Sequence, residues 1–136
     1  MQTVDGAIRN YINNSTSFED ASSTAMIAAV TFRLAVLKNN FATYIANAEA
    51  AYNYVSSNID SDGWLRHTVD PEAFSNLSTT DNPSPEGQSF VLLMESARRD
   101  FQDLQVNSVS RKGVPTFLFS CLVVAYSTLF LFDLSR

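Results

Sequence analysis

Residues 83–101 read PSPEGQSFVLLMESARRDF, which is the clearest helix signal in the chain. Ser84 is suited to cap a helix, and Pro85 to occupy its first position, where the missing N–H costs nothing. Apolar side chains then recur every three or four residues, at Phe90, Leu93, Met94, Ala97, Phe101 and Leu104. This spacing predicts an amphipathic helix that begins at Pro85 and buries that face.

Two more amphipathic helices are predicted before it, over residues 17–38 and 41–59. Ser17, Glu19 and Asp20 supply a cap and negative charge at the start of the first. The faces expected to be buried are Met26, Ile27, Val30, Leu34 and Leu37 in the first helix, and Phe41, Tyr44, Ile45, Ala48, Tyr52 and Val55 in the second. Because the link KNN is short, these two helices should form an antiparallel hairpin.

The rest of the amino-terminal region also suggests helix. Residues 4–12, VDGAIRNYI, predict a fragment of an earlier helix, and no strand-like alternation lies between the helical segments. The hydrophobic fraction of 46% and the charged fraction of 17% are those of a globular domain. The predicted fold class is therefore all-α.

An irregular segment of about two dozen residues, 60–83, separates the second and third helices. Loops of this length in compact domains usually have a function. The run DSDGWLRHTVDPEAF within it holds the chain's only tryptophan and only histidine. Trp64 either stacks on a ligand ring or packs against the helices and so anchors the loop. Arg66 and His67 either hold a carboxylate, which suits a guanidinium, or are solvated loop residues.

Composition argues against several classes of function. A net charge of −5 and scattered basic residues argue against a nucleic-acid binder. The single cysteine, Cys121, and the lone His67 form no ligand cluster, so neither a metal nor another cofactor is predicted. Asp20 and Glu86 stand at helix starts, where an acidic residue is explained by capping or by the helix dipole.

Residues 114–132, VPTFLFSCLVVAYSTLFLF, carry no charge over nineteen residues. They predict an apolar helix after a linker over residues 107–113. One interpretation is a membrane-spanning helix and hence membrane association, since about 20 residues cross a bilayer core. Another interpretation is that this run is the abnormal ending of a gene model and stands in place of the protein's ordinary carboxyl terminus. A GPI-type signal is disfavoured by the charges that follow, and a buried core helix by the absence of a polar face.

The sequence gives opposing indications of compartment. No signal peptide is expected at the amino terminus, because no basic region precedes an apolar one. The segments NNST (13–16) and NLS (76–78) contain N-x-[ST] triplets, which accept N-linked glycans in secreted proteins but also occur by chance. The predicted localisation is therefore either the membrane or the extracellular space.

Two motifs resemble those of the six-hairpin glycosidases, the unsaturated glycuronyl and rhamnogalacturonyl hydrolases of glycoside hydrolase families 88 and 105. DASSTAMIAA (20–29) is similar to the family's Glu-x-Ser-x-Ser-Ala-Met helix start, with Asp20 in place of Glu and Thr24 in place of the second Ser. The run from Asp60 through SPEGQSFVLLM is similar to its final hairpin, where an Asp-Gly-aromatic turn precedes a Gly-containing helix. Over residues 1–106 the resemblance implies part of an (α/α)6 barrel of helical hairpins.

The resemblance also implies a function. These enzymes remove a 4,5-unsaturated uronic acid from fragments of pectin-type glycans by protonating its double bond and adding water. It follows that the chain is part of a glycoside hydrolase with an oligosaccharide substrate, which Trp64, Arg66 and His67 would bind.

The family's catalytic Asp lies in the first half of the barrel, to which no position here corresponds. We therefore expect no catalytic residue in this chain, an incomplete catalyst, and open apolar faces that a partner chain covers. The alternative is a non-catalytic, membrane-tethered helical module that binds glycan or protein.

Overall fold

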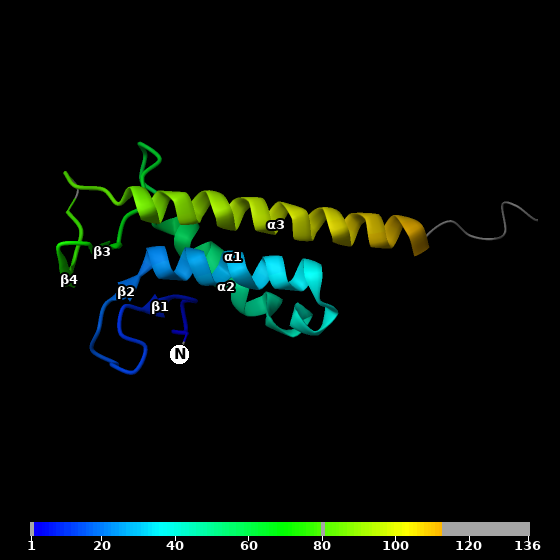
Figure 1. Cartoon of the computed structure of the whole chain (residues 1–136), viewed down its shortest axis with the longest axis horizontal. Coiled ribbons are helices and arrows are strands. Elements are labelled where there is room, and N and C mark those ends of the chain that lie inside the picture. Colours follow the sequence, from blue (N-terminus) through cyan, green and yellow to red (C-terminus); the bar gives the residue numbers. More distant parts are fainter. Residues whose placement is uncertain (1, 80, 113–136) are drawn as a thin grey trace, which may run out of the picture. The chain divides into compact units, whose positions relative to one another are not determined.

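The computed structural model describes residues 2–79 and 81–112. The chain divides into two units, Met1–Gln102 and Asp103–Arg136. The described helices are α1 (Ala21–Leu37), α2 (Ile45–Ser57) and α3 (Pro85–Lys112), and Figure 1 shows their order along the chain. Of the second unit, only the carboxyl-terminal turns of α3 are described. These turns span residues 103–112, so positions 107–112 of the linker predicted over 107–113 are helical.

The α1–α2 hairpin confirms the prediction from the short link. The chain turns back through a 3-10 helix, η1 (Asn39–Tyr44), which replaces the first turn expected of the second helix. The cap predicted at Asp20 is also confirmed. Its two carboxylate oxygens accept the backbone N–H groups of Ser22 and Ser23, each at 3.1 Å.

Short strands correct the all-α prediction, although the chain is mostly helical. Strands β1 (Ile8–Arg9) and β2 (Glu19–Asp20) pair antiparallel, and so do β3 (Val69–Asp70) and β4 (Ala73–Leu77). The helix expected over residues 4–12 is wrong. Gly6 has φ +93°, which ends any helical path, and the Ile8 N–H donates to the Thr24 hydroxyl at 2.8 Å.

The buried side of α1 is not the one that the sequence predicted. Small residues and one aromatic face the core: Ala21, Ser22, Thr24, Ala25, Ala28, Ala29, Phe32 and Ala35. Most of the aliphatic residues expected to be buried are exposed instead, including Val30 at 53%. Alanine and serine let neighbouring helices approach α1 closely, so the packing selects the small side and leaves the bulky one open.

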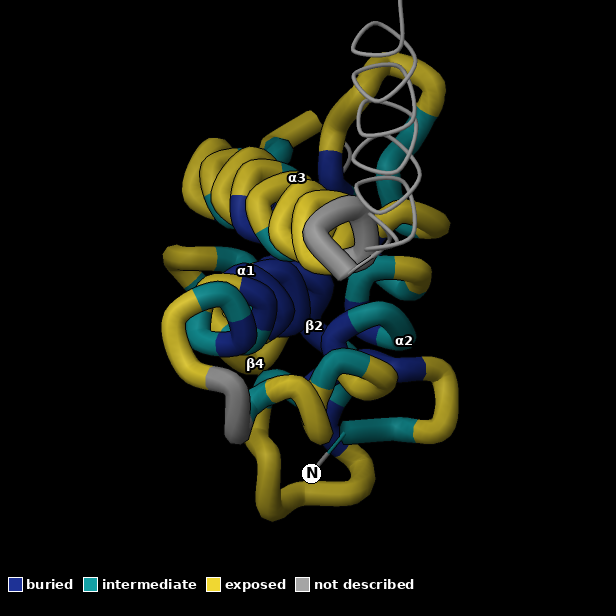
Figure 2. The backbone as a smooth tube through the Cα atoms, turned by 90° about the vertical axis from the view of Figure 1, so that its right-hand side faces the viewer, coloured by how far each residue is buried: buried dark blue, intermediate teal, exposed yellow. Residues whose placement is uncertain are grey.

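α1 packs against both α2 and α3, which also contact each other, and Figure 2 shows buried residues gathered along α1. Met94 and Ala97 of α3 are buried as predicted, whereas Leu93 is 56% exposed. The Phe32 and Phe101 rings lie 6.0 Å apart between α1 and α3. The ion pairs Arg33–Asp100 and Arg98–Glu49 tie α3 to α1 and to α2.

The apolar run 114–132 lies outside the described residues. Within residues 2–79 and 81–112, no helix is both long enough and apolar enough to span a bilayer.

Candidate functional site

The turn from Asp60 to Arg66 holds the residues singled out by the sequence. The Asp60 carboxylate accepts the backbone N–H groups of Asp62 and Trp64, both at 2.9 Å, and Gly63 turns the chain with φ +86°. The hydrogen bond from Trp64 and the pairing with Arg66 lower the pKa of Asp60. A lowered pKa keeps this carboxyl ionised near neutral pH, so Asp60 is unsuited to act as a proton donor.

Arg66 takes part in the turn rather than extending from it. Its Nε donates to the second carboxylate oxygen of Asp60 at 2.5 Å, and a second guanidinium nitrogen pairs with the same oxygen. The side chain is half-buried. A ligand carboxylate approaching this guanidinium would therefore share it with Asp60.

The residue that anchors the turn to the helices is Leu65, not Trp64. Leu65 is 1% exposed within the core, whereas Trp64 is 36% exposed. The side-chain amide of Gln88 on α3 accepts the Leu65 N–H at 2.9 Å and donates to the Gly63 carbonyl at 3.0 Å. Sequence reasoning missed Leu65 and Gln88. The apolar Leu65 next to Trp64 was the available signal.

His67 has φ +56° and an exposed side chain. Its backbone carbonyl accepts the Ala21 N–H at 2.9 Å at the start of α1. The neighbouring Asp20 carboxylate also accepts the Val69 N–H at 3.2 Å. The turn is therefore fixed to the first residues of both α1 and α3, which brings Trp64, Arg66 and His67 to the end of the bundle where these helices begin.

Gly87 marks where the two helix starts meet. A Cβ on this residue would stand 3.1 Å from Thr68 Cγ2 and 3.3 Å from Ser22 Cβ. The Gly87 N–H donates to the Ser84 hydroxyl at 3.0 Å, which confirms Ser84 as the cap of α3. The space that glycine leaves is thus filled by the chain itself.

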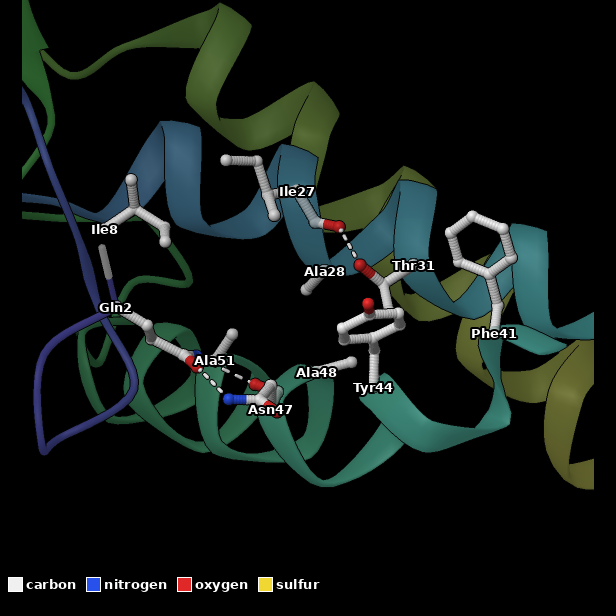
Figure 3. A pocket seen from close by; sticks show the side chains of 10 residues that line it. All are labelled: Gln2, Ile8, Ile27, Ala28, Thr31, Phe41, Tyr44, Asn47, Ala48 and Ala51. Atoms are coloured by element: carbon white, nitrogen blue, oxygen red, sulfur yellow. Dashed lines mark hydrogen bonds between the residues drawn. The ribbon is translucent and has the colours of Figure 1, made fainter. Parts of the chain in front are cut away.

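Other hollows lie away from this turn. An apolar pocket of about 300 Å³ is lined by residues of α1, η1, α2 and the amino-terminal segment, with Tyr44 and Thr31 on its wall (Figure 3). A more polar cleft of about 660 Å³ includes Asp5, Arg9 and Glu19.

Burial, and then the charges of Glu19 and Asp20, raise the pKa of Tyr54 to about 12. In the part of the chain that the structure describes, no cluster of His, Cys, Asp and Glu could hold a metal ion.

Comparison with known proteins places the fold. No family model matches the chain, and neither does any curated protein. Two crystal structures match it with a TM-score of 0.58, each described as a possible member of the GH105 family. The fold is GH105-like. One protein is from Salmonella enterica serovar Paratyphi A, at 22% identity, and the other from Klebsiella pneumoniae, at 23%.

Each GH105-like match covers 72% of this chain but 28% of the solved protein. The chain therefore spans little more than a quarter of the length of either. At this identity the likeness concerns the fold, and it agrees at that level with the resemblance drawn from the two motifs.

Proposed function

We propose that this chain is part of a glycoside hydrolase acting on unsaturated uronyl oligosaccharides from pectin-type glycans. The observation that carries the proposal is the GH105-like fold, found over 72% of the chain. The motifs at Asp20–Ala29 and Asp60–Met94 agree with that fold and support the same proposal.

The exposed side of α1 supports the view that the functional unit is larger than this chain. We call Met26, Ile27, Val30, Leu34 and Leu37 the aliphatic stripe; Leu34 is half-buried and the other four are exposed. With the buried alanines opposite, the stripe makes α1 apolar on both sides, and helices of this kind are normally enclosed by other helices. In the proposed unit, further helical hairpins cover the stripe, either as a partner chain or as another part of a longer protein.

The proton donor belongs to those further hairpins. The double bond of the unsaturated uronic acid is part of an enol ether. Adding water to it needs a carboxylic acid that is held protonated beside the double bond. Asp60 is held in its ionised form, and Asp20 has its carboxylate turned onto the backbone of its own helix and of β3. The proposed role of this chain is substrate contact.

That contact centres on Trp64. Trp64 is partly exposed on a turn whose backbone is held by Asp60 and Gln88, and an exposed aromatic side chain suits stacking on a sugar ring. Arg66 and His67 follow Trp64 closely in the chain and, in this proposal, supply the cationic and hydrogen-bonding groups that a uronate carboxylate requires.

The test uses two signals from one titration. The full chain is mixed with an unsaturated galacturonyl-rhamnose disaccharide while the ultraviolet absorbance of the double bond and the tryptophan fluorescence are recorded. Because Trp64 is the only tryptophan, its emission reports on the turn alone. We expect saturable quenching without loss of the double bond.

The matched control is Leu92→Ala, an exposed residue of α3, which should leave the quenching unchanged. Arg66→Lys should weaken it, because an ammonium does not reproduce the paired geometry of a guanidinium. Absence of saturable quenching would reject substrate contact, and loss of the double bond with this chain alone would reject the assignment of the donor to other hairpins.

A further inference from the structure

The chain between β1 and β2 forms an exposed loop whose two ends are held together by hydrogen bonds. Residues 11–16 are all exposed, and Figure 1 shows them as a loop at the amino-terminal end of α1. At its base the Arg9 guanidinium donates to the Ser17 carbonyl at 2.6 Å, and the Asn10 N–H donates to the Phe18 carbonyl at 3.0 Å. The loop thus presents its tip to solvent without being part of the core.

The tip carries the overlapping triplets Asn13-Asn14-Ser15 and Asn14-Ser15-Thr16. Asn14 Oδ1 accepts two hydrogen bonds from Thr16, one from the backbone N–H at 3.0 Å and one from the hydroxyl at 2.8 Å. This local turn brings the amide and the hydroxyl of one triplet together on an exposed surface.

The other two acceptor asparagines are less favourably placed. Asn13 lines the polar cleft together with Asp5 and Glu19, so its side chain borders other parts of the chain. Asn76 lies within β4, and the hydroxyl of its triplet, on Ser78, is 2.5 Å from the Thr68 hydroxyl. Of the three, only the Asn14 triplet combines an exposed asparagine with a hydroxyl that interacts solely with that asparagine.

We infer that Asn14 is the residue of this chain that receives an N-linked glycan when the chain enters a secretory compartment. The co-reactant is an oligosaccharide joined to a polyprenyl diphosphate, brought by an oligosaccharyltransferase. The Asn14 Nδ2 attacks the anomeric carbon, the C–N bond forms as the C–O bond to the diphosphate breaks, and polyprenyl diphosphate leaves. Nδ2 gives up one proton to a base of the transferase, and no electrons are exchanged.

A glycan at Asn14 is compatible with the proposed function. The hydrogen bonds that fix the Trp64 turn to the helix starts do not involve residues 11–16. The modification therefore adds a bulky polar group to an exposed loop without replacing a contact of the turn. It is independent of the proposed glycosidase role and can hold if that role fails.

The experiment expresses the full chain behind a cleavable secretion signal in yeast and assays both cells and medium. Intact mass is measured before and after treatment with an N-glycan amidase, which converts a glycosylated Asn to Asp. Peptide mapping of the wild-type protein then locates the converted residue. We expect conversion at Asn14.

Single-residue variants test which of the three triplets carries the glycan. Asn14→Gln and Thr16→Ala should lose that glycan, whereas Thr16→Ser keeps the triplet and should retain it. Ser15→Ala removes only the Asn13 triplet, and Asn76→Gln only the third, so both should keep the Asn14 glycan. A wild-type chain without a glycan, or with one only at Asn13 or Asn76, would overturn the inference, whether or not any variant folds.

Discussion

Tyr54 illustrates at the scale of a residue how burial changes chemistry. Its pKa of about 12 in the folded chain exceeds the value of about 10 expected when unfolded. The folded state therefore holds the phenolic proton more tightly. The resulting contribution to stability is complete below pH about 10 and is lost as the pH rises towards 12.

We predict that Tyr54→Phe removes this loss. Chemical denaturation at a series of alkaline pH values should show a steeper decline in unfolding free energy for the wild type than for the variant. Glu19→Gln should lower the pKa of Tyr54 only in part, because burial is the larger cause. A Tyr54 that ionises together with the other tyrosines in an ultraviolet titration would contradict the prediction.

Gly6 and Gly63 both have positive φ, but their surroundings differ. A Cβ on Gly6 would lie 2.4 Å from the Ala50 carbonyl oxygen, whereas a Cβ on Gly63 would meet nothing within 4 Å. Gly63→Ala should cost roughly 1–2 kcal/mol from backbone strain alone. Gly6→Ala should cost roughly 1–3 kcal/mol more, because the backbone of α2 must move.

The two glycine variants are compared by thermal and denaturant unfolding. Gly63→Asn is the control, since asparagine tolerates a left-handed backbone and should recover part of the loss at that position. Equal destabilisation by the two alanine variants would show that the clash at Gly6 has been misjudged.

At the scale of an element, α3 offers a matched pair of adjacent residues. Met94 is 0% exposed and Leu93 is 56% exposed, although the sequence placed both on the buried face. Met94→Ala should cost about 2–5 kcal/mol of unfolding free energy, because it leaves a cavity in the core. Leu93→Ala should change stability by no more than about 0.5 kcal/mol. Denaturant unfolding measures the loss of unfolding free energy in each variant. A larger loss for Leu93→Ala than for Met94→Ala would contradict the packing of α3.

The helices also show what periodicity can predict. The Asp20 and Ser84 caps and the α1–α2 hairpin were predicted because a cap and a short link act over a few residues. The buried side of α1 was not, because both of its sides are apolar and the spacing alone cannot rank them. The preference for bulk was wrong here, since close helix packing favours the alanine side.

For the whole molecule, the aliphatic stripe makes a prediction about association. If it is an uncovered packing surface, the purified full chain should self-associate through it. Val30→Lys should raise the concentration at which association occurs and leave helix content unchanged, as judged by sedimentation and circular dichroism. Phe74→Lys is the control, because Phe74 is exposed to a similar degree but lies on β4. An equal effect of the two variants would contradict this role of the stripe.

Part of the candidate site could likewise be predicted from the sequence, and part of it could not. The sequence located the turn and its Asp-Gly bend, because turn chemistry is local. It did not show that Leu65 is the anchor, that Gln88 bridges to α3, or that Arg66 is held by Asp60. Gln88 lies more than twenty residues from its partners Gly63 and Leu65, and no local pattern links them.

The sequence by itself determined the start of α3, the caps of α1 and α3, and that the first two helices form a hairpin. Tertiary structure decided which side of α1 is buried, that the amino-terminal segment pairs as a strand, and that Leu65 enters the core in place of Trp64. The physical reason is range. Caps and turns depend on hydrogen bonds between near neighbours, whereas burial depends on which distant surfaces can approach most closely.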